Sequence, residues 1–336
     1  SNSGHSDKRN FNEPDDSNFL KTLLAKADII NRGNAVSNIG AVSSHIQIHQ
    51  NNKSSCLSSG EPGQAQPFKR GQYSDDVIAE LLQNAIQNNK IDVFIQPVMK
   101  LPQRAPIAFE FYGRIRAKPG LYIPASIYYP IAEKENLLSD IDNAVLMACL
   151  ETLRDQIKRD KGTKNLKKNI LNITVGTLTD TSFMHQLLQF MGRYKSFASS
   201  LILEMNYQEF LAFSPDIEEI YKGLAEIGCS LSLSGISNDK LDLTWLRSLG
   251  IDILRVSGPA LASEIKDNPQ KLKEVSSNIE MLKEHGFDII ADYVENNQIL
   301  AELLDLPVHY AQGYLLGKPD SPRTYNMAVY NSRFAA

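Results

Sequence analysis

The chain has 336 residues, which is enough for one large domain with an extension or for two ordinary domains. Hydrophobic residues make up 42% and charged residues 22%, as in most globular proteins. The net charge of −4 argues against a general nucleic-acid binder, because such proteins carry a basic excess. No apolar run approaches the roughly 18–20 residues of a membrane helix, and no signal peptide is visible.

The three cysteines, Cys56, Cys149 and Cys229, are far apart and odd in number. They have neither the spacing of a disulfide framework nor that of a zinc site, which favours a reducing compartment. The opening Ser1-Asn2-Ser3 is compatible with a cloning remnant on a piece of a longer protein. We therefore expect a cytoplasmic chain, either by itself or as the soluble part of an inner-membrane-anchored protein.

Residues 1–72 are polar and poor in long apolar runs, so we predict a largely disordered arm. Within it, Asp16 and Ser17 are suited to cap a short helix over residues 17–31. Such a helix is marginal by itself, and the alternative is the end of an upstream coiled coil or partner helix.

Order is predicted from residue 73, where Ser74 caps a helix and a strand follows at Ile91–Pro97. The short turn Leu101–Arg104 leads into a second strand, so this first pair is predicted to be an antiparallel hairpin. Helices and strands then alternate. Helices are predicted at 124–135, 139–158, 178–193, 216–227, 241–249, 269–285 and 298–304, and strands at 169–175, 201–205, 230–233, 251–256, 289–292 and near 309–312.

This alternation over about 240 residues predicts an α/β fold, a (β/α)8 TIM-like barrel spanning residues 73–322 with a tail at 323–336. No GxGxxG follows a strand, which argues against an open dinucleotide-binding sheet. In such barrels the functional residues lie at the C-terminal ends of the strands.

The stretch Phe109–Arg116 alternates apolar and polar residues with the period of a strand, which places Glu110 and Arg114 on one face. A carboxylate there is suited to a cation and a guanidinium to a phosphate. The alternative is a surface ion pair on a half-exposed strand.

Several segments together resemble the ordered landmarks of the EAL domain, a family that hydrolyses or senses cyclic di-GMP. They are Phe94-Ile95-Gln96-Pro97, Glu110-Phe-Tyr-Gly-Arg114, Leu171-Asn172-Ile173, Leu203-Glu204-Met205, Ile290-Ala291-Asp292-Tyr293-Val294-Glu295 and Gln312-Gly313-Tyr314-Leu315. The resemblance covers residues 74–320 and implies a barrel of the EAL type. Within the family, the segment at 101–104 and the degenerate motifs look most similar to TipF-type flagellar-assembly proteins.

The family uses two divalent cations, about 3.5–4 Å apart, to activate a water for phosphodiester hydrolysis. By the resemblance, Glu110, Asn172, Glu204, Glu295 and Gln312 match its metal ligands. Its Asp-Asp pair falls on Ser234-Gly235, its Lys on Arg255, and a later Asp on Ser257.

Neither Ser nor Gly supplies a carboxylate, so we expect no phosphodiesterase activity and no required cofactor. The alternatives are a single cation, Mg²⁺ or Ca²⁺, on Glu110, Asn172 and Glu204, and Asp292 as a substitute ligand.

The resemblance also implies that Arg114 contacts a ligand phosphate and that Gln96 lines a base pocket. Tyrosines 112, 122, 128, 129 and 314 are candidates for walls that stack on guanine, or else for barrel core. Asn172 is alternatively a turn cap, and Glu204 the partner of a core arginine. The predicted ligand-binding residues are Gln96, Glu110, Arg114, Asn172, Glu204, Arg255, Glu295 and Gln312.

Our first hypothesis is a catalytically inactive receptor or scaffold for cyclic di-GMP in flagellar or polar-complex assembly. The alternatives are a pure protein-interaction module and an active phosphodiesterase. Expected partners are cyclic di-GMP, proteins of such a complex and a second copy of the chain, with no DNA. Contact with a membrane is expected only through a missing upstream segment.

Overall fold

The computed structural model describes residues 71–88, 90–160, 166–236 and 241–325. Most of the predicted arm at 1–72, including its short helix at 17–31, lies outside these residues, as does the predicted tail from residue 326 onward. The first described helix, Asp75–Gln87, begins where the sequence predicts it, because the Ser74 side chain accepts the backbone N–H of Val77.

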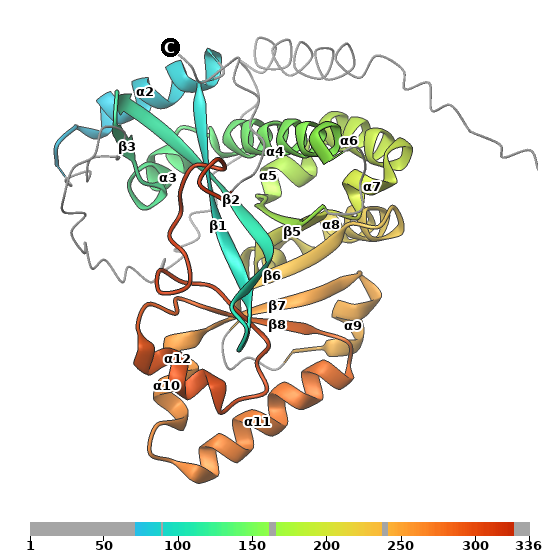
Figure 1. Ribbon diagram of the computed structural model, residues 1–336. Coiled ribbons are helices and arrows are strands. Elements are labelled where there is room, and N and C mark those ends of the chain that lie inside the picture. The colour runs from blue at the N-terminus through green and yellow to red at the C-terminus, as the bar shows by residue number, and fades with distance from the viewer. Residues whose placement is uncertain (1–70, 89, 161–165, 237–240, 326–336) are drawn as a thin grey trace, which may run out of the picture. The chain divides into compact units, whose positions relative to one another are not determined.

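The described strands form one sheet in the order β1-β9-β8-β7-β6-β5-β4-β2-β3, and an additional β1–β2 pairing closes eight of them into a barrel. The first two strands run antiparallel as a long hairpin, as predicted, and β4 to β9 are parallel to β2 (Figure 1). The strands are β1 Ile91–Lys100, β2 Ala105–Lys118, β3 Leu121–Ile123, β4 Lys168–Asn172, β5 Leu201–Asn206, β6 Ser230–Ile236, β7 Ile251–Ser257, β8 Asp288–Asp292 and β9 Tyr310–Ala311.

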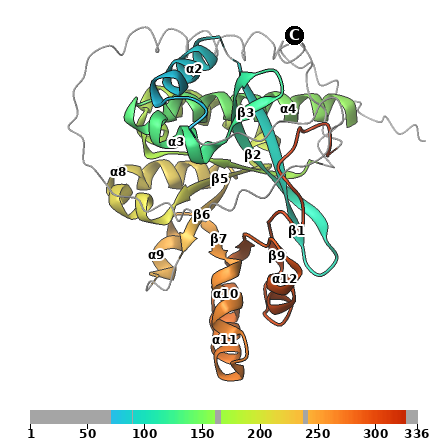
Figure 2. The same cartoon turned by 90° about the vertical axis from the view of Figure 1, so that its left-hand side faces the viewer.

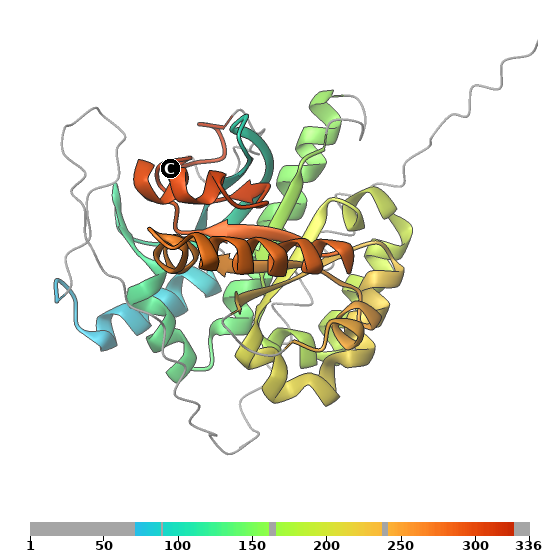
Figure 3. The same ribbon diagram turned by 90° about the horizontal axis from the view of Figure 1, so that it is seen from below.

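Helices follow the strands and cover the barrel. The α2 helix packs beside α3 (Figure 2), α4 packs on β1, β2 and β4, α8 packs on β5 and β6, and α11 packs along β8 (Figure 3). The helices are α2 Asp75–Gln87, α3 Ala125–Lys134, α4 Leu138–Asp160, α5 Val175–Thr179, α6 Thr181–Arg193, α7 Lys195–Ala198, α8 Tyr207–Glu226, α9 Leu243–Ser248, α10 Gly258–Ile265, α11 Pro269–Glu284 and α12 Asn297–Leu304.

A layer of small and branched apolar residues fills the barrel interior below the polar ends of the strands. Each comes from a different strand, and β-branched side chains suit such a layer because they stack well on a pleated surface. The layer consists of Val98, Ala108, Ile170, Ile202, Ile253 and Ile290, with Ile107 and Tyr310 packed against it.

Local capping explains most differences from the predicted elements. The predicted helix at 178–193 is two helices, because Asp180 ends α5 and its side chain accepts the N–H of Phe183 to cap α6. The α8 helix begins at Tyr207 and not at Asp216, because Asn206 Oδ1 accepts the N–H of Gln208 at 2.9 Å. The short elements β3 and α7 were not predicted, since they span too few residues to show a period, and the eight-residue α10 was also missed.

Two further findings concern the membrane and the thiols. Across the residues that the structure describes, no helix combines the length and the apolar character needed to cross a membrane.

Cys149 and Cys229 are buried free thiols, and burial raises the pKa of the Cys229 thiol to about 12.

Candidate ligand site at the mouth of the barrel

The parallel strands end at one rim of the barrel, here called the mouth, and Arg255 lies buried at its centre. Its Nη1 donates to Glu110 Oε2 at 2.8 Å and to Glu204 Oε1 at 3.1 Å. Its Nε and Nη2 donate to the carboxylate of Asp292, the shorter bond being 2.6 Å. Strand β7 thus places one guanidinium against carboxylates from β2, β5 and β8.

Neutral polar side chains complete this cluster. Arg255 Nη2 also donates to Gln312 Oε1. Asn172 Nδ2 donates to Glu110 Oε1 at 2.7 Å, and Ser232 Oγ donates to Glu204 Oε2 at 2.7 Å. Glu110, Glu204 and Arg255 are each at most 4% exposed, so the interactions among these three residues are shielded from water. We call Glu110, Glu204, Arg255, Asp292 and Gln312 the arginine cluster.

The arginine cluster has three carboxylates and one guanidinium, so the charges do not balance when every group is ionised. Burial raises the pKa of Glu204 to about 7, although the Arg255 charge works in the other direction. Burial also raises the pKa of Asp292. For Glu110, burial raises the pKa, but the charge of Arg255 together with hydrogen bonds from Arg255, Asn172 and Tyr112 lowers the pKa overall. Glu204 is therefore the carboxyl of the cluster that retains its proton up to near-neutral pH.

This proton predicts a pH dependence of stability. Between the ordinary Glu pKa of 4.5 and about 7, the folded chain retains the Glu204 proton and the unfolded chain loses it. The free energy of unfolding should therefore decrease as the pH rises through this window, by on the order of 1–3 kcal/mol. Urea denaturation at several pH values measures the effect.

Glu204→Gln is the matched variant, because its amide keeps an oxygen for Arg255 and Ser232 but does not titrate. It should flatten most of this slope. Asp142, whose pKa burial raises to about 6, contributes in the same direction and should account for the remaining slope. An unchanged slope in Glu204→Gln would place the proton elsewhere.

Beyond the arginine cluster, the β1–β2 hairpin continues past the other strands and carries Arg114. The guanidinium carbon of Arg114 lies 5.7 Å from the ring centres of both Phe94 and Tyr112. No ion pair of Arg114 is found within the described ranges. Its neighbour Arg116 differs, because it forms a bidentate pair with Asp92 at 2.7 Å. Arg114 is thus a half-buried cation held by aromatic rings at the mouth.

The structure brings most of the predicted site residues together. Gln96 pairs with Glu110 across the hairpin, and Gln96 Nε2 donates to the carbonyl of Gly317 at 2.8 Å. Glu110, Asn172, Glu204, Arg255 and Gln312 contact one another directly or through one partner. The alternative in which Glu204 pairs with a core arginine is the arrangement observed.

Glu295 is placed differently. The chain turns sharply after β8, with Tyr293 at a φ of 59°, and the Glu295 side chain is exposed. Asp292 is the last residue of β8, directly before this turn, and it is the carboxylate that reaches Arg255. Sequence reasoning considered Asp292 only as a substitute metal ligand and did not single out Ser232. The position of Asp292 at the last residue of a strand was the available signal.

Two serines and two tyrosines that the sequence analysis singled out lie outside the arginine cluster. Ser257 caps α10, since its Oγ accepts the N–H of Ala260 at 3.3 Å. Ser234 Oγ donates to the carbonyl of Met205 at 3.4 Å. Tyr128 is buried, and its hydroxyl donates to the carbonyl of Gly113, which makes it a core residue. Tyr314 is 48% exposed and remains a candidate for stacking.

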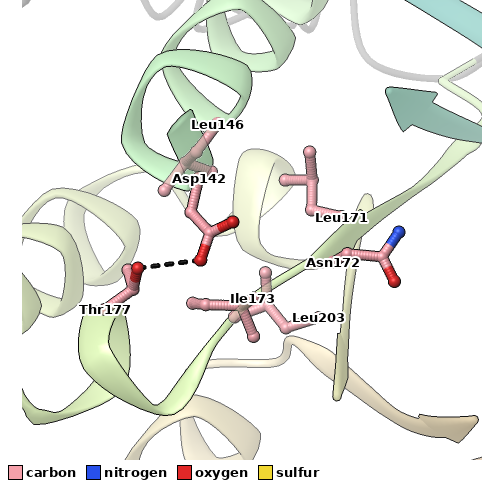
Figure 4. Close-up of a pocket in the computed structure, with 7 residues that line it drawn as sticks. All are labelled: Asp142, Leu146, Leu171, Asn172, Ile173, Thr177 and Leu203. Carbon is pink, nitrogen blue, oxygen red and sulfur yellow. Dashed lines mark hydrogen bonds between the residues drawn. The ribbon is translucent and has the colours of Figure 1, made fainter. Parts of the chain in front are cut away.

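Behind Asn172, Asp142 fixes the corner between β4 and α5. Its Oδ2 accepts the N–H and hydroxyl of Thr174, both at 2.7 Å, and the hydroxyl of Thr177 at 2.9 Å. Figure 4 shows the carboxylate between Thr177 and the apolar residues of a small cavity. That cavity, lined in part by Asn172, has a volume of about 10 Å³, which is room for one water and not for a ligand. These bonds hold the chain just after the end of β4, the strand that carries Asn172.

A closed α/β barrel with buried polar residues at the C-terminal ends of its strands belongs to a class that binds ligands at this mouth. The sequence profile of the EAL domain matches residues 79–319. The chain belongs to the EAL domain family.

Curated relatives agree with this membership. The chain is 23% identical over 238 residues to the cyclic di-GMP phosphodiesterase PdeF of Escherichia coli, a match that covers 71% of this chain and 31% of PdeF. It is 21% identical to the cyclic di-GMP phosphodiesterase PdeA of Borreliella burgdorferi, over 72% of this chain and 36% of PdeA. The chain thus spans about a third of the length of these two relatives.

Solved structures share the fold. The FimX EAL domain of Pseudomonas aeruginosa, bound to c-di-GMP, matches with a TM-score of 0.59 at 20% identity, covering 72% of this chain and 96% of that one. The PaMucR phosphodiesterase in complex with c-di-GMP matches with a TM-score of 0.62 at 19% identity, covering 74% and 99%.

Proposed function

We propose that this EAL domain is a receptor for cyclic di-GMP that does not hydrolyse it. The observation that carries the proposal is the position of Arg255. Its guanidinium fills the space between Glu110, Glu204 and Asp292, where carboxylates of different strands converge.

The donor set does not fit the pair of divalent cations that phosphodiester hydrolysis in this family requires. Hard cations need several free oxygen ligands, whereas these carboxylate oxygens already accept hydrogen bonds from Arg255, Asn172 and Ser232. Over the described stretches of the chain, no group of three or more His, Cys, Asp or Glu side chains is arranged to hold a metal ion.

The backbone at the position of the family's Asp-Asp pair gives further support. Gly235 has a φ of +71°, a conformation that other residues rarely adopt. A Cβ at this glycine would lie 2.9 Å from Asn206 Nδ2. A second carboxylate at this position is therefore opposed mainly by backbone strain, and it would also have to displace the tip of the Asn206 side chain.

Ligand binding is supported by the outer part of the mouth. Cyclic di-GMP carries two phosphates and two guanines, so it requires cationic donors and flat apolar surfaces. Arg114, held over Phe94 and Tyr112, supplies a fork suited to a phosphate. The excess negative charge of the arginine cluster opposes an anionic ligand, and the proton on Glu204 reduces that opposition.

A calorimetric titration with cyclic di-GMP, in the presence and absence of Mg²⁺, tests the proposal. We expect binding that does not need the metal and no linear product on prolonged incubation. Arg114→Ala should weaken binding by roughly tenfold to a hundredfold, the usual effect of losing a charge-assisted hydrogen bond. Arg116→Ala is the matched control, because it removes an arginine two residues along the same strand that already pairs with Asp92.

Turnover of cyclic di-GMP at enzymatic rates would contradict the proposed loss of catalysis. Flat titrations with both the parent chain and Arg116→Ala would favour the second candidate function, a pure protein-interaction module. The occupation of the mouth by Arg255 is the observation that favours this second candidate.

The biological setting that we propose is flagellar or polar-complex assembly, on the strength of the resemblance to TipF-type proteins. A fluorescent fusion should then gather at a cell pole, and a uniform distribution would argue against this setting.

A further inference from the structure

The opposite end of the barrel, where β4 and β5 begin, has a marked excess of basic side chains. These come from the last turn of α4, the start of β4 and the junction between α6 and α7. All are exposed: Lys158, Arg159, Lys167, Lys168, Arg193 and Lys195. Because the whole chain has a net charge of −4, this concentration is a local feature and does not reflect the average composition.

A cavity lies within this basic surface. It has a volume of about 150 Å³ and is lined by Leu166, Lys168, Ser196, Ser199 and Ser200. This is about ten times the roughly 10–15 Å³ that a single water needs, so a small polyatomic group fits.

The polar groups of the cavity are suited to an anion. Lys168 Nζ donates to Ser230 Oγ at 3.2 Å, which leaves further ammonium hydrogens for another acceptor. The Ser199 hydroxyl makes a long bond of 3.2 Å to the carbonyl of Ser196, which it can exchange for a stronger acceptor. Asp252 is within electrostatic range of Lys168, but its Oδ1 accepts the N–H of Leu231 at 3.1 Å.

We propose that this serine-lined cavity and its basic surround bind a phosphate group. A compact ammonium charge with hydroxyl donors matches the several acceptor oxygens of phosphate. The phosphate belongs either to a free phosphorylated anion or to the headgroup of an anionic lipid. The site lies at the end of the barrel away from the mouth, so the proposal goes beyond the function proposed above and does not depend on it.

Two binding measurements distinguish the sources of the phosphate. One is calorimetric titration with inorganic pyrophosphate. The other is co-sedimentation with vesicles of phosphatidylglycerol and phosphatidylcholine, compared with phosphatidylcholine alone. The test variant is Lys168→Glu with Lys195→Glu, and the control with the same change of charge is Lys134→Glu with Lys273→Glu, whose lysines are exposed on α3 and α11. We expect the test variant to bind at least roughly tenfold more weakly than the parent chain and the control to bind like the parent.

Binding of pyrophosphate with no vesicle binding assigns the site to a free anion, and binding to the phosphatidylglycerol vesicles alone assigns it to a lipid headgroup. Equal loss in the test variant and the control, or no binding of either probe to the parent chain, overturns the proposal. If the test variant fails to fold by circular dichroism, Lys168→Gln with Lys195→Gln replaces it. Arg114→Ala should still bind pyrophosphate if the two sites are separate.

Discussion

Replacing Arg255 with alanine should lower the free energy of unfolding by about 3–5 kcal/mol, as is usual when one partner of a buried ion pair is removed. Three buried carboxylates, Glu110, Glu204 and Asp292, would lose their shared counter-charge. Protonation of these groups would limit the cost, so the loss should be larger at high pH than at low pH. Urea denaturation of the parent and variant chains measures both effects.

Three comparisons isolate the cause. Arg255→Lys keeps the charge but not the planar fork, so its loss should be smaller than that of alanine and still clear. Arg116→Ala removes a partly exposed guanidinium that has a single carboxylate partner, the buried Asp92, and should cost less than Arg255→Ala, about 1–3 kcal/mol. Glu204→Gln should recover part of the stability of Arg255→Ala, because the two residues are in contact. If Arg255→Ala and Arg116→Ala lower the free energy of unfolding equally, the three carboxylates of the cluster do not depend on the Arg255 charge in the way proposed.

Gly313→Ala should be the next most damaging change, at or above the upper end of the ~1–3 kcal/mol that overpacking costs. A Cβ there would lie 2.2 Å from the carbonyl oxygen of Val294 and 2.3 Å from its nitrogen. Both atoms belong to backbone that is hydrogen-bonded, since Val294 N donates to Gln312 O and Val294 O accepts from Leu315 N. The two segments must therefore separate, which also displaces Gln312 from Arg255.

Gly192→Ala is the matched control, because nothing lies within 4 Å of a Cβ at Gly192 in α6. It should leave stability unchanged or raise it by up to ~1 kcal/mol, as expected when alanine replaces glycine in a helix. Thermal unfolding of the two variants gives the comparison. If Gly313→Ala is as stable as Gly192→Ala, the segments around Gly313 and Val294 can move apart at little cost in stability.

The sequence by itself determined the fold class and named most of the residues that gather at the mouth of the barrel. Alternating strand and helix periods predicted the barrel, and the short turn after β1 predicted the antiparallel first pair, because these features depend on local geometry. The same local patterns failed for β3 and α7, which have three and four residues. That Ser234-Gly235 carries no carboxylate was also readable from the chain alone, and its correspondence to the acidic pair of the family stays a prediction.

Only the tertiary structure decided how the site residues pair. Arg255 and Glu110 are 145 residues apart, and no local period indicates that they meet. The strand period placed Glu110 and Arg114 on one face, but Glu110 pairs with Arg255, while Arg114 lies over Phe94 and Tyr112. Likewise, the turn at Tyr293 decided that Asp292 and not Glu295 reaches the arginine. Barrel closure brings distant strand ends together, so the partners of a buried charge depend on strand register and on loop turns that the sequence pattern does not encode.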